Sequence, residues 1–235
     1  MKISAFLKHR YVNLKTLIDS SELPYGAFLY INPFNYFFLR RNLKLLNNSY
    51  YRMDGIYLVS ILRLYLSKKL MVSRQSFDMT SLAPIIFDYC AKNKLSVFVS
   101  GGDVYELKRF ITIISERYPN LLWAGYCDGY QDEDFIISSV LKSNSDVALL
   151  GLGNIKQEKV ATALARKKEA GRYFTCGAFI SQTGKGGVIN YYPAILNRLN
   201  LRWAYRFVKE PHTIYRVIRF YPAFLIAFLF DIVRR

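Results

Sequence analysis

Between residues 85 and 185 the sequence repeats one local pattern: a short apolar run, a turn that contains glycine, and a stretch that favours helix. The apolar runs are continuous rather than alternating in polarity, which indicates strands buried on both faces. The runs and their turns are 95–100 before Gly101-Gly102-Asp103, 121–125 before Asp128-Gly129-Tyr130, 146–150 before Gly151-Leu152-Gly153, and 173–176 before Gly177-Ala178-Phe179. Helix-favouring segments follow at 105–117, 132–142 and 157–170. The pattern predicts a Rossmann-like α/β fold, a parallel sheet flanked by helices.

The glycine turns mark a candidate ligand site. Ligands of doubly wound folds bind beyond the carboxyl ends of the strands, where small residues let backbone N–H groups approach a phosphate. One glycine turn is weak evidence, because a tight turn needs glycine for its backbone alone. Four such turns in register favour a nucleotide or nucleotide-sugar site. Neither GxxxxGK[ST] nor a strict GxGxxG occurs, which disfavours P-loop hydrolysis and ordinary dinucleotide chemistry.

The chain contains two His and three Cys. Their scattered positions disfavour a zinc site, a His-based triad and a disulfide framework. A general base would then be a carboxylate, and Asp54, at a turn before the apolar run 57–66, is the candidate. Asn32, after the apolar run 27–31, is a candidate for hydrogen bonding to a base or a sugar. The alternative roles are an N-cap or turn residue for Asp54 and an Asn-Pro turn for Asn32.

Basic residues are concentrated toward the ends of the chain. There are 33 Lys+Arg against 17 Asp+Glu, a net charge of +16, and residues 201–235 carry seven against two. Such an excess favours a polyanionic partner, either an anionic membrane or a nucleic acid. These partners correspond to two functions. The first is an enzyme that works at a membrane, and the alternative is a Rossmann-like protein that binds nucleic acid or modifies RNA.

The C-terminal segment combines basic and apolar residues. Its longest apolar run, 220–230, is shorter than the roughly 20 residues that a membrane-spanning helix needs. Six upstream basic residues recur every three or four positions and would share one helical face, with Pro211 as a predicted interruption: Arg202, Arg206, Lys209, His212, Arg216 and Arg219. This pattern is typical of an interfacial anchor on anionic lipid, and a helix that caps the core is the alternative. We expect a Rossmann-like domain at 1–195 and a basic, membrane-associating appendage at 196–235.

The motifs occur in the order of a known family. They are Asp54-Gly55, Gly101-Gly102, Arg117-Tyr118-Pro119, Gly125, Asp128-Gly129-Tyr130, Gly151-Leu152-Gly153 before Lys156-Gln157-Glu158, Gly177-Ala178-Phe179 before Gly184-Lys185, and in the tail Trp203, Tyr205, Arg206, Glu210, Pro211 and Arg216. In order and spacing these residues resemble the WecG/TagA/CpsF glycosyltransferase family, glycosyltransferase family 26. The resemblance extends over about residues 28 to 222.

The resemblance implies an inverting hexosyltransferase that uses a UDP-sugar and requires no metal or other cofactor. It implies an undecaprenyl-diphosphate-linked saccharide as acceptor, at the cytoplasmic face of the bacterial plasma membrane. The products would be surface polysaccharides such as capsule, exopolysaccharide, O-antigen or teichoic acid. A homo-oligomer is compatible with the resemblance.

The resemblance also implies site residues. Asp54 would be the general base, and Arg206 and Arg216 would meet the acceptor diphosphate. The implied donor-binding residues are Asn32, Gly101, Gly102, Asp128, Gly129, Tyr130, Gly151, Gly153 and Gln157. The chain departs from the family pattern at Tyr30, Ile180, Tyr191 or Tyr192, and Arg202, positions that bear on the donor sugar and on acceptor contacts. These departures leave open a scaffold role without turnover.

Overall fold

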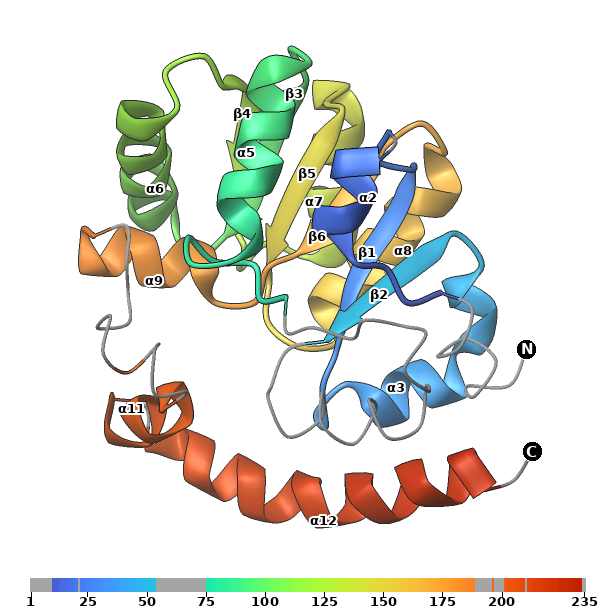
Figure 1. Ribbon diagram of the computed structural model, residues 1–235. Helices are drawn as coiled ribbons and strands as arrows, with labels where there is room; N and C mark the ends of the chain where they lie inside the picture. The colour runs from blue at the N-terminus through green and yellow to red at the C-terminus, as the bar shows by residue number, and fades with distance from the viewer. Residues whose placement is uncertain are drawn as a thin grey trace.

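The computed structural model describes residues 10–20, 22–53, 75–188, 196, 201–209 and 211–233. Its centre is one sheet of parallel strands in the order β2-β1-β6-β5-β3-β4 (Figure 1). The strands are β1 Gly26–Ile31, β2 Ser49–Met53, β3 Ser96–Gly101, β4 Leu122–Cys127, β5 Val147–Gly151 and β6 Arg172–Thr175. The predicted Rossmann-like α/β fold is confirmed.

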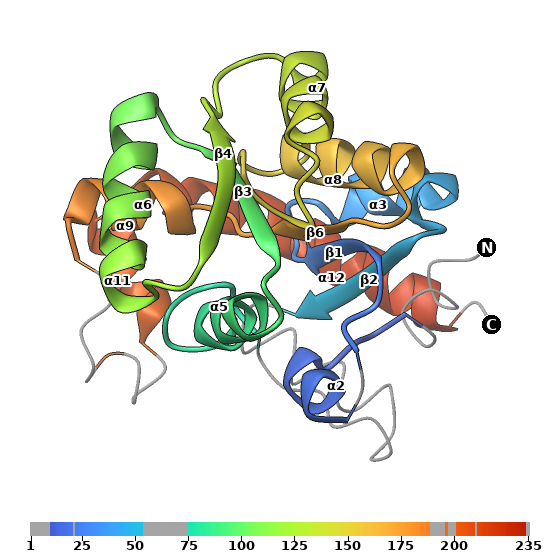
Figure 2. The ribbon, with the colours of Figure 1, turned by 90° about the horizontal axis from the view of Figure 1, so that it is seen from above.

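Helices cover both faces of this sheet (Figure 2). One face packs against α2 (Leu14–Ser20), α5 (Leu82–Lys92), α6 (Val104–Arg117) and α9 (Phe179–Gly186). The other packs against α3 (Tyr36–Arg41), the 3₁₀ helix η1 (Leu43–Leu46), α7 (Glu133–Ser143), α8 (Lys156–Lys167) and α12 (His212–Val233). Alternate residues of β1 enter opposite cores, Phe28 on one side and Leu29 on the other, and both are fully buried. Burial on both sides is the reason why the strands read as continuous apolar runs.

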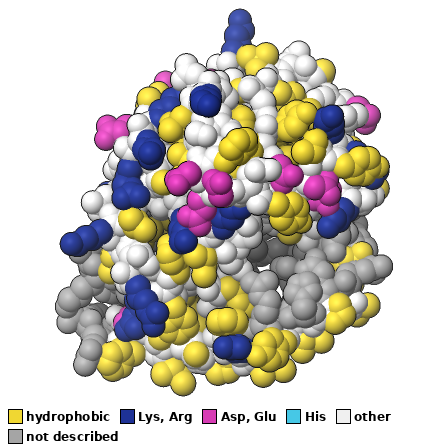
Figure 3. All heavy atoms as spheres, turned by 180° about the vertical axis from the view of Figure 1, so that it is seen from behind, with side chains coloured by type: hydrophobic (Ala, Val, Ile, Leu, Met, Phe, Trp, Pro, Cys, Tyr) yellow, Lys and Arg dark blue, Asp and Glu magenta, His cyan; other side chains and the backbone are white. Residues whose placement is uncertain are grey.

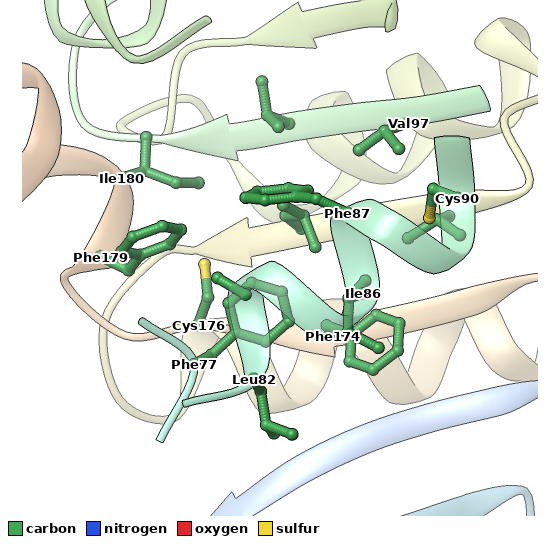
Figure 4. Packing of buried hydrophobic residues seen from close by; sticks show 14 of the residues in the cluster. Phe77, Leu82, Ile86, Phe87, Cys90, Val97, Phe174, Cys176, Phe179 and Ile180 are labelled. Atoms are coloured by element: carbon green, nitrogen blue, oxygen red, sulfur yellow. The ribbon is translucent and has the colours of Figure 1, made fainter. Parts of the chain in front are cut away.

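The core reaches the carboxyl edge of the sheet, where the candidate site lies. Figure 4 shows Phe87 of α5, Phe174 of β6 and the α9 residues Phe179 and Ile180 in one apolar cluster. Phe174 stacks on Phe28 with ring centroids 4.5 Å apart. Because Phe179 and Ile180 are 5% and 0% exposed, they fix α9 against the ends of the strands. Each such side chain contributes about 1.5–3 kcal/mol on burial.

Most expected element boundaries agree with the structure within two residues, and the helix expected at 157–170 is the main difference. It ends at Lys167, because Lys168 has extended backbone angles, φ −133° and ψ 95°. The Lys168 ammonium donates to Asn144 Oδ1 at 2.8 Å and to the Ser145 carbonyl at 2.9 Å. These contacts hold the chain out of the helix, so that it turns into β6.

The C-terminal helices are separated at Pro211, as the sequence predicts. Residues Arg202–Lys209 form α11, and α12 begins at His212. The apolar run 220–230 continues the same helix as the preceding basic segment. Phe224 and Phe228 are buried against Tyr36 of α3, with ring centroids 5.0 and 5.8 Å apart. The tail therefore caps the core with one side, and a domain boundary at residue 195 stays a prediction.

Figure 1 shows α12 as a long helix that passes below α3, at the edge toward which the strands point. Among the helices of the described residues, none has both the length and the apolar character that crossing a bilayer requires.

Candidate active site

The strand order creates a topological switch point between β3 and β5. These strands are neighbours with Gly101 paired to Gly151, yet the helices that follow them, α6 and α8, cover opposite faces. Chains that leave adjacent strands in opposite directions open a crevice at the carboxyl edge, which is the usual ligand site of such folds. The glycine turns of the sequence meet at this edge.

Four of these glycines lie in contact across neighbouring strand ends. A Cβ on Gly129 would lie 2.7 Å from the Gly101 Cα, one on Gly101 would lie 2.9 Å from the Gly151 oxygen, and one on Gly151 would lie 2.9 Å from the Gly177 oxygen. A side chain at Gly129, Gly101 or Gly151 would push the neighbouring backbone segments apart. These glycines therefore close the floor of the site by backbone packing.

Gly153, and Gly177 in addition to its contact with Gly151, have a second property. Gly153 and Gly177 have φ values of +79° and +57°, in the left-handed region that glycine adopts without strain. Apart from its chain neighbours, a Cβ at either position would meet no atom of the described residues within 4 Å. Their backbones border open space, so a ligand can approach them closely.

A cation is held beside the start of α6. Asp103 caps this helix by accepting from the Glu106 N–H at 2.8 Å, and Glu106 completes a capping box. The Glu106 carboxylate, 2% exposed, pairs with the Lys185 ammonium of α9 at 3.0 Å. The hydrogen bond that the Lys185 ammonium donates to Glu106, together with the negative charge of this carboxylate, raises the pKa of Lys185. Lys185 therefore stays charged beside Glu106.

A second cation connects two loops. The Lys156 ammonium donates to the Gly129 carbonyl at 2.8 Å and also to the Gln131 carbonyl. This contact joins the loop after β5 to the loop after β4. In the latter loop, Asp128 accepts from the Tyr130 N–H at 2.7 Å, and the Tyr130 side chain is 74% exposed. The loop thus presents an aromatic ring at the rim of the site.

Asn32 has the turn role that the sequence left as an alternative, and its amide is also directed toward the site. Its Oδ1 accepts from the N–H groups of Phe34 and Asn35 at 2.9 and 3.1 Å, ahead of α3. Its Nδ2 lies 3.4 Å from Asn154 Oδ1, in the loop after β5. The two amides bring the loops after β1 and β5 together.

Gln157 lies beneath the site. It is 2% exposed, and both ends of its amide contact protein groups. Its Oε1 accepts from the Gly177 N–H at 3.1 Å, and its Nε2 donates to Glu158 at 3.0 Å. Burial raises the pKa of Glu158, whose partners Gln157, Asn35 and the Ile155 N–H oppose that shift.

The structure does not describe the side chains of three expected site residues. Asp54 lies outside the described residues, and β2, which leads toward it, ends at Met53. Arg206 and Arg216 belong to α11 and α12, with only their backbones described. Within the described ranges, no three His, Cys, Asp or Glu residues come together as a metal site would need. Independence of metal stays a prediction.

Sequence reasoning missed Asn35 and Ile155. Asn35 is fully buried and donates to Tyr30 O and to Glu158 at 2.7 and 2.9 Å. Ile155 has φ +75°, a rare conformation for a β-branched residue. No periodic pattern in the sequence marks Asn35. Nothing in the sequence marks the positive φ of Ile155 either, because isoleucine strongly prefers negative φ.

The sequence matches one family of known proteins. The model of the glycosyl transferase WecG/TagA/CpsF family matches residues 31–235. The chain is 31% identical to a UDP-Gal:α-D-GlcNAc-diphosphoundecaprenol β-1,4-galactosyltransferase of Shigella boydii, over 94% of this chain and 92% of the relative. It is 27% identical to an N-acetylglucosaminyldiphosphoundecaprenol N-acetyl-β-D-mannosaminyltransferase of Bacillus subtilis, over 88% of this chain and 77% of the relative. The chain therefore belongs to the WecG/TagA/CpsF family of glycosyltransferases.

Proposed function

We propose that this glycosyltransferase moves a hexose from a UDP-sugar to a saccharide on undecaprenyl diphosphate, in bacterial surface-polysaccharide synthesis. Both relatives are named for diphosphoundecaprenol-linked N-acetylglucosamine acceptors and for β-linked transfer, and one is named for a UDP-sugar donor. The observation that carries the proposal is the carboxyl edge of the sheet around the switch point between β3 and β5. At this edge a Cβ on Gly153 or Gly177 would meet no atom of the described residues beyond its chain neighbours, and Lys156 and Lys185 supply positive charge.

The charge of the site suits a departing diphosphate. When the bond between C1 of the donor sugar and the β-phosphate oxygen breaks, its electron pair leaves on UDP. Cations and backbone N–H groups that already face this position lower the barrier, because they need no rearrangement. Lys185 is held by Glu106 at 3.0 Å and Lys156 by the Gly129 carbonyl at 2.8 Å, so both are oriented before a ligand binds.

Asp54 is our candidate for the base. The acceptor hydroxyl oxygen attacks C1 opposite the leaving UDP, its proton passes to the Asp54 carboxylate, and the configuration at C1 inverts. A single base is sufficient for this one-step displacement. Asp54 follows β2, which pairs with β1, and the Asn32 turn follows β1 at the same edge of the sheet.

We place the enzyme at the cytoplasmic face of the membrane, and the outer side of α12 supports the peripheral membrane contact. While Phe224 and Phe228 face the core, large apolar side chains on the other side are exposed (Figure 3). They are Ile214, Tyr215, Ile218, Leu225, Ile226, Leu229 and Phe230. An apolar stripe on a helix in a chain of net charge +16 fits insertion between the headgroups of anionic lipid.

A release assay tests the proposal. The protein is incubated with single UDP-sugars, beginning with UDP-galactose, and with N-acetylglucosamine diphosphate on a short polyprenyl chain. UDP release that requires both substrates, with a β-linked disaccharide product, is the expected result. UDP binding without turnover on any donor in the panel would instead favour a scaffold.

A further inference from the structure

A buried carboxylate beneath the crevice connects three turns at the carboxyl edge of the sheet. Glu158, the third residue of α8, is 0% exposed. It accepts from Asn35 Nδ2 at 2.9 Å, from Gln157 Nε2 at 3.0 Å and from the backbone N–H of Ile155. We propose that Glu158 is a positioning residue of the donor site, which holds these turns in the arrangement that binds the diphosphate of the UDP-sugar. The ligand in this inference rests on the proposed function.

The partners of Glu158 extend its effect across neighbouring strands. Through Asn35 it reaches the end of β1, because Asn35 Nδ2 also donates to the Tyr30 carbonyl at 2.7 Å and Asn35 Oδ1 accepts from the Asn32 N–H at 3.0 Å. Through Gln157 it reaches the end of β6, because Gln157 Oε1 accepts from the Gly177 N–H at 3.1 Å. One carboxylate therefore connects the turns after β1, β5 and β6, which are adjacent in the sheet.

Ile155 shows what the carboxylate holds in place. Its φ of +75° and ψ of −51° lie in a strained region that costs about 1–3 kcal/mol for a residue with a Cβ. Its side chain is 39% exposed, so burial does not fix it strongly, while its N–H donates to Glu158. Ile155 lies between Gly153 and Lys156, so its backbone angles decide how the open glycine and the cation face each other.

The ionised form of Glu158 is the one that these partners require. All three groups donate, and two carboxylate oxygens can accept from all of them. An amide at this position has one oxygen, so its NH₂ group would face either the Ile155 N–H or the amides of Asn35 and Gln157. Glu158→Gln thus keeps the size of the side chain and introduces a conflict between donors.

A comparison of two variants separates positioning from stability. Glu158→Gln is measured beside Thr162→Val, which removes a buried hydroxyl on the same helix that donates to the Glu158 carbonyl at 2.8 Å. UDP affinity is measured by calorimetry, and amide hydrogen exchange of residues 151–157 is followed without ligand. We expect Glu158→Gln to weaken UDP binding about tenfold and to accelerate exchange in this turn. Thr162→Val should lower the melting temperature with UDP binding unchanged.

A rescue variant provides a second readout. Glycine adopts positive φ without strain, so adding Ile155→Gly to Glu158→Gln should restore part of the UDP affinity. If Glu158→Gln folds poorly, Glu158→Asp, which keeps the charge on a shorter side chain, should still weaken UDP binding.

Equal UDP affinity in wild type and Glu158→Gln, or an equal loss in Thr162→Val, overturns the inference. Failure of the wild type to bind UDP refutes the proposed donor instead, and unchanged exchange at 151–157 would then overturn the positioning role.

Discussion

Asp231, near the end of α12, forms an ion pair with Arg40 on α3: its Oδ1 accepts from Arg40 Nη2 at 2.7 Å, and its Oδ2 lies 2.6 Å from Arg40 Nε. The two residues lie 191 positions apart in the chain. Tyr36, one turn earlier on α3, donates its hydroxyl to the same carboxylate at 2.7 Å and contacts Phe224 and Phe228 with its ring. The C-terminal helix is thereby joined to the helix that follows the Asn32 turn.

Asp231→Asn should lower the free energy of unfolding by about 1 kcal/mol, because a bidentate, charge-assisted contact is weakened in a half-exposed setting. Chemical denaturation followed by circular dichroism measures this change. Glu133→Gln, which breaks the exposed pair between Lys159 and Glu133, is the matched control and should cost less than about 0.5 kcal/mol. Equal effects of the two variants would show that Asp231 is an ordinary surface charge.

Asp54→Asn should abolish sugar transfer and leave UDP affinity unchanged, because the amide cannot take the proton of the acceptor hydroxyl. The loss should be at least about 100-fold in turnover, as for removal of other general bases. UDP release on the preferred donor measures the rate, and calorimetry measures binding. Near-normal turnover would remove Asp54 from the role of base.

Lys185→Gln should weaken UDP binding about tenfold, because a charge-assisted contact to phosphate contributes about 1.5–3 kcal/mol. Lys159→Gln is its matched control, since both lysines pair with a glutamate at 3.0 Å, and Lys159 lies on the side of α8 that faces α7. The control should bind UDP as the wild type does. Identical affinities for both variants would exclude Lys185 from the donor site.

Paired substitutions on α12 test the membrane surface. Ile226→Glu with Leu229→Glu, at positions 72% and 55% exposed, should reduce co-sedimentation with anionic liposomes and leave the melting temperature unchanged. Phe224→Ala, on the buried side, should instead destabilise the fold by about 3–5 kcal/mol. RNA in place of liposomes tests the alternative partner. Strong, salt-dependent RNA binding with no liposome binding would contradict the membrane proposal.

The cysteines should be unreactive in the folded protein. Cys90, Cys127 and Cys176 are all buried, and burial raises the pKa of each thiol, that of Cys90 to about 12. Because the thiolate is the reactive form, a disulfide reagent at pH 8 should label none of the three until denaturant is added. Rapid labelling of the native protein would show that the core around α5 opens easily.

The α/β class, the positions of most strands and helices, and the break at Pro211 could be predicted from local patterns of residues. These features are local: a strand buried on both faces must be apolar throughout, and Pro211, which has no backbone N–H to donate, lies where α11 ends and α12 begins. The order of the motifs also identified the family. Asp54, Arg206 and Arg216 remain predictions, because the described side chains do not include them.

Only the tertiary structure decided what each glycine does and which polar groups meet. Gly151 and Gly153 look alike in the sequence, yet a Cβ on the first would collide with Gly177 and one on the second would meet no atom of the described residues beyond its chain neighbours. The buried contact between Asn35 and Glu158 spans 123 positions of the chain. Such contacts depend on strand order, which places β1, β6 and β5 side by side. No local pattern encodes that order, because it arises from the packing of the whole sheet.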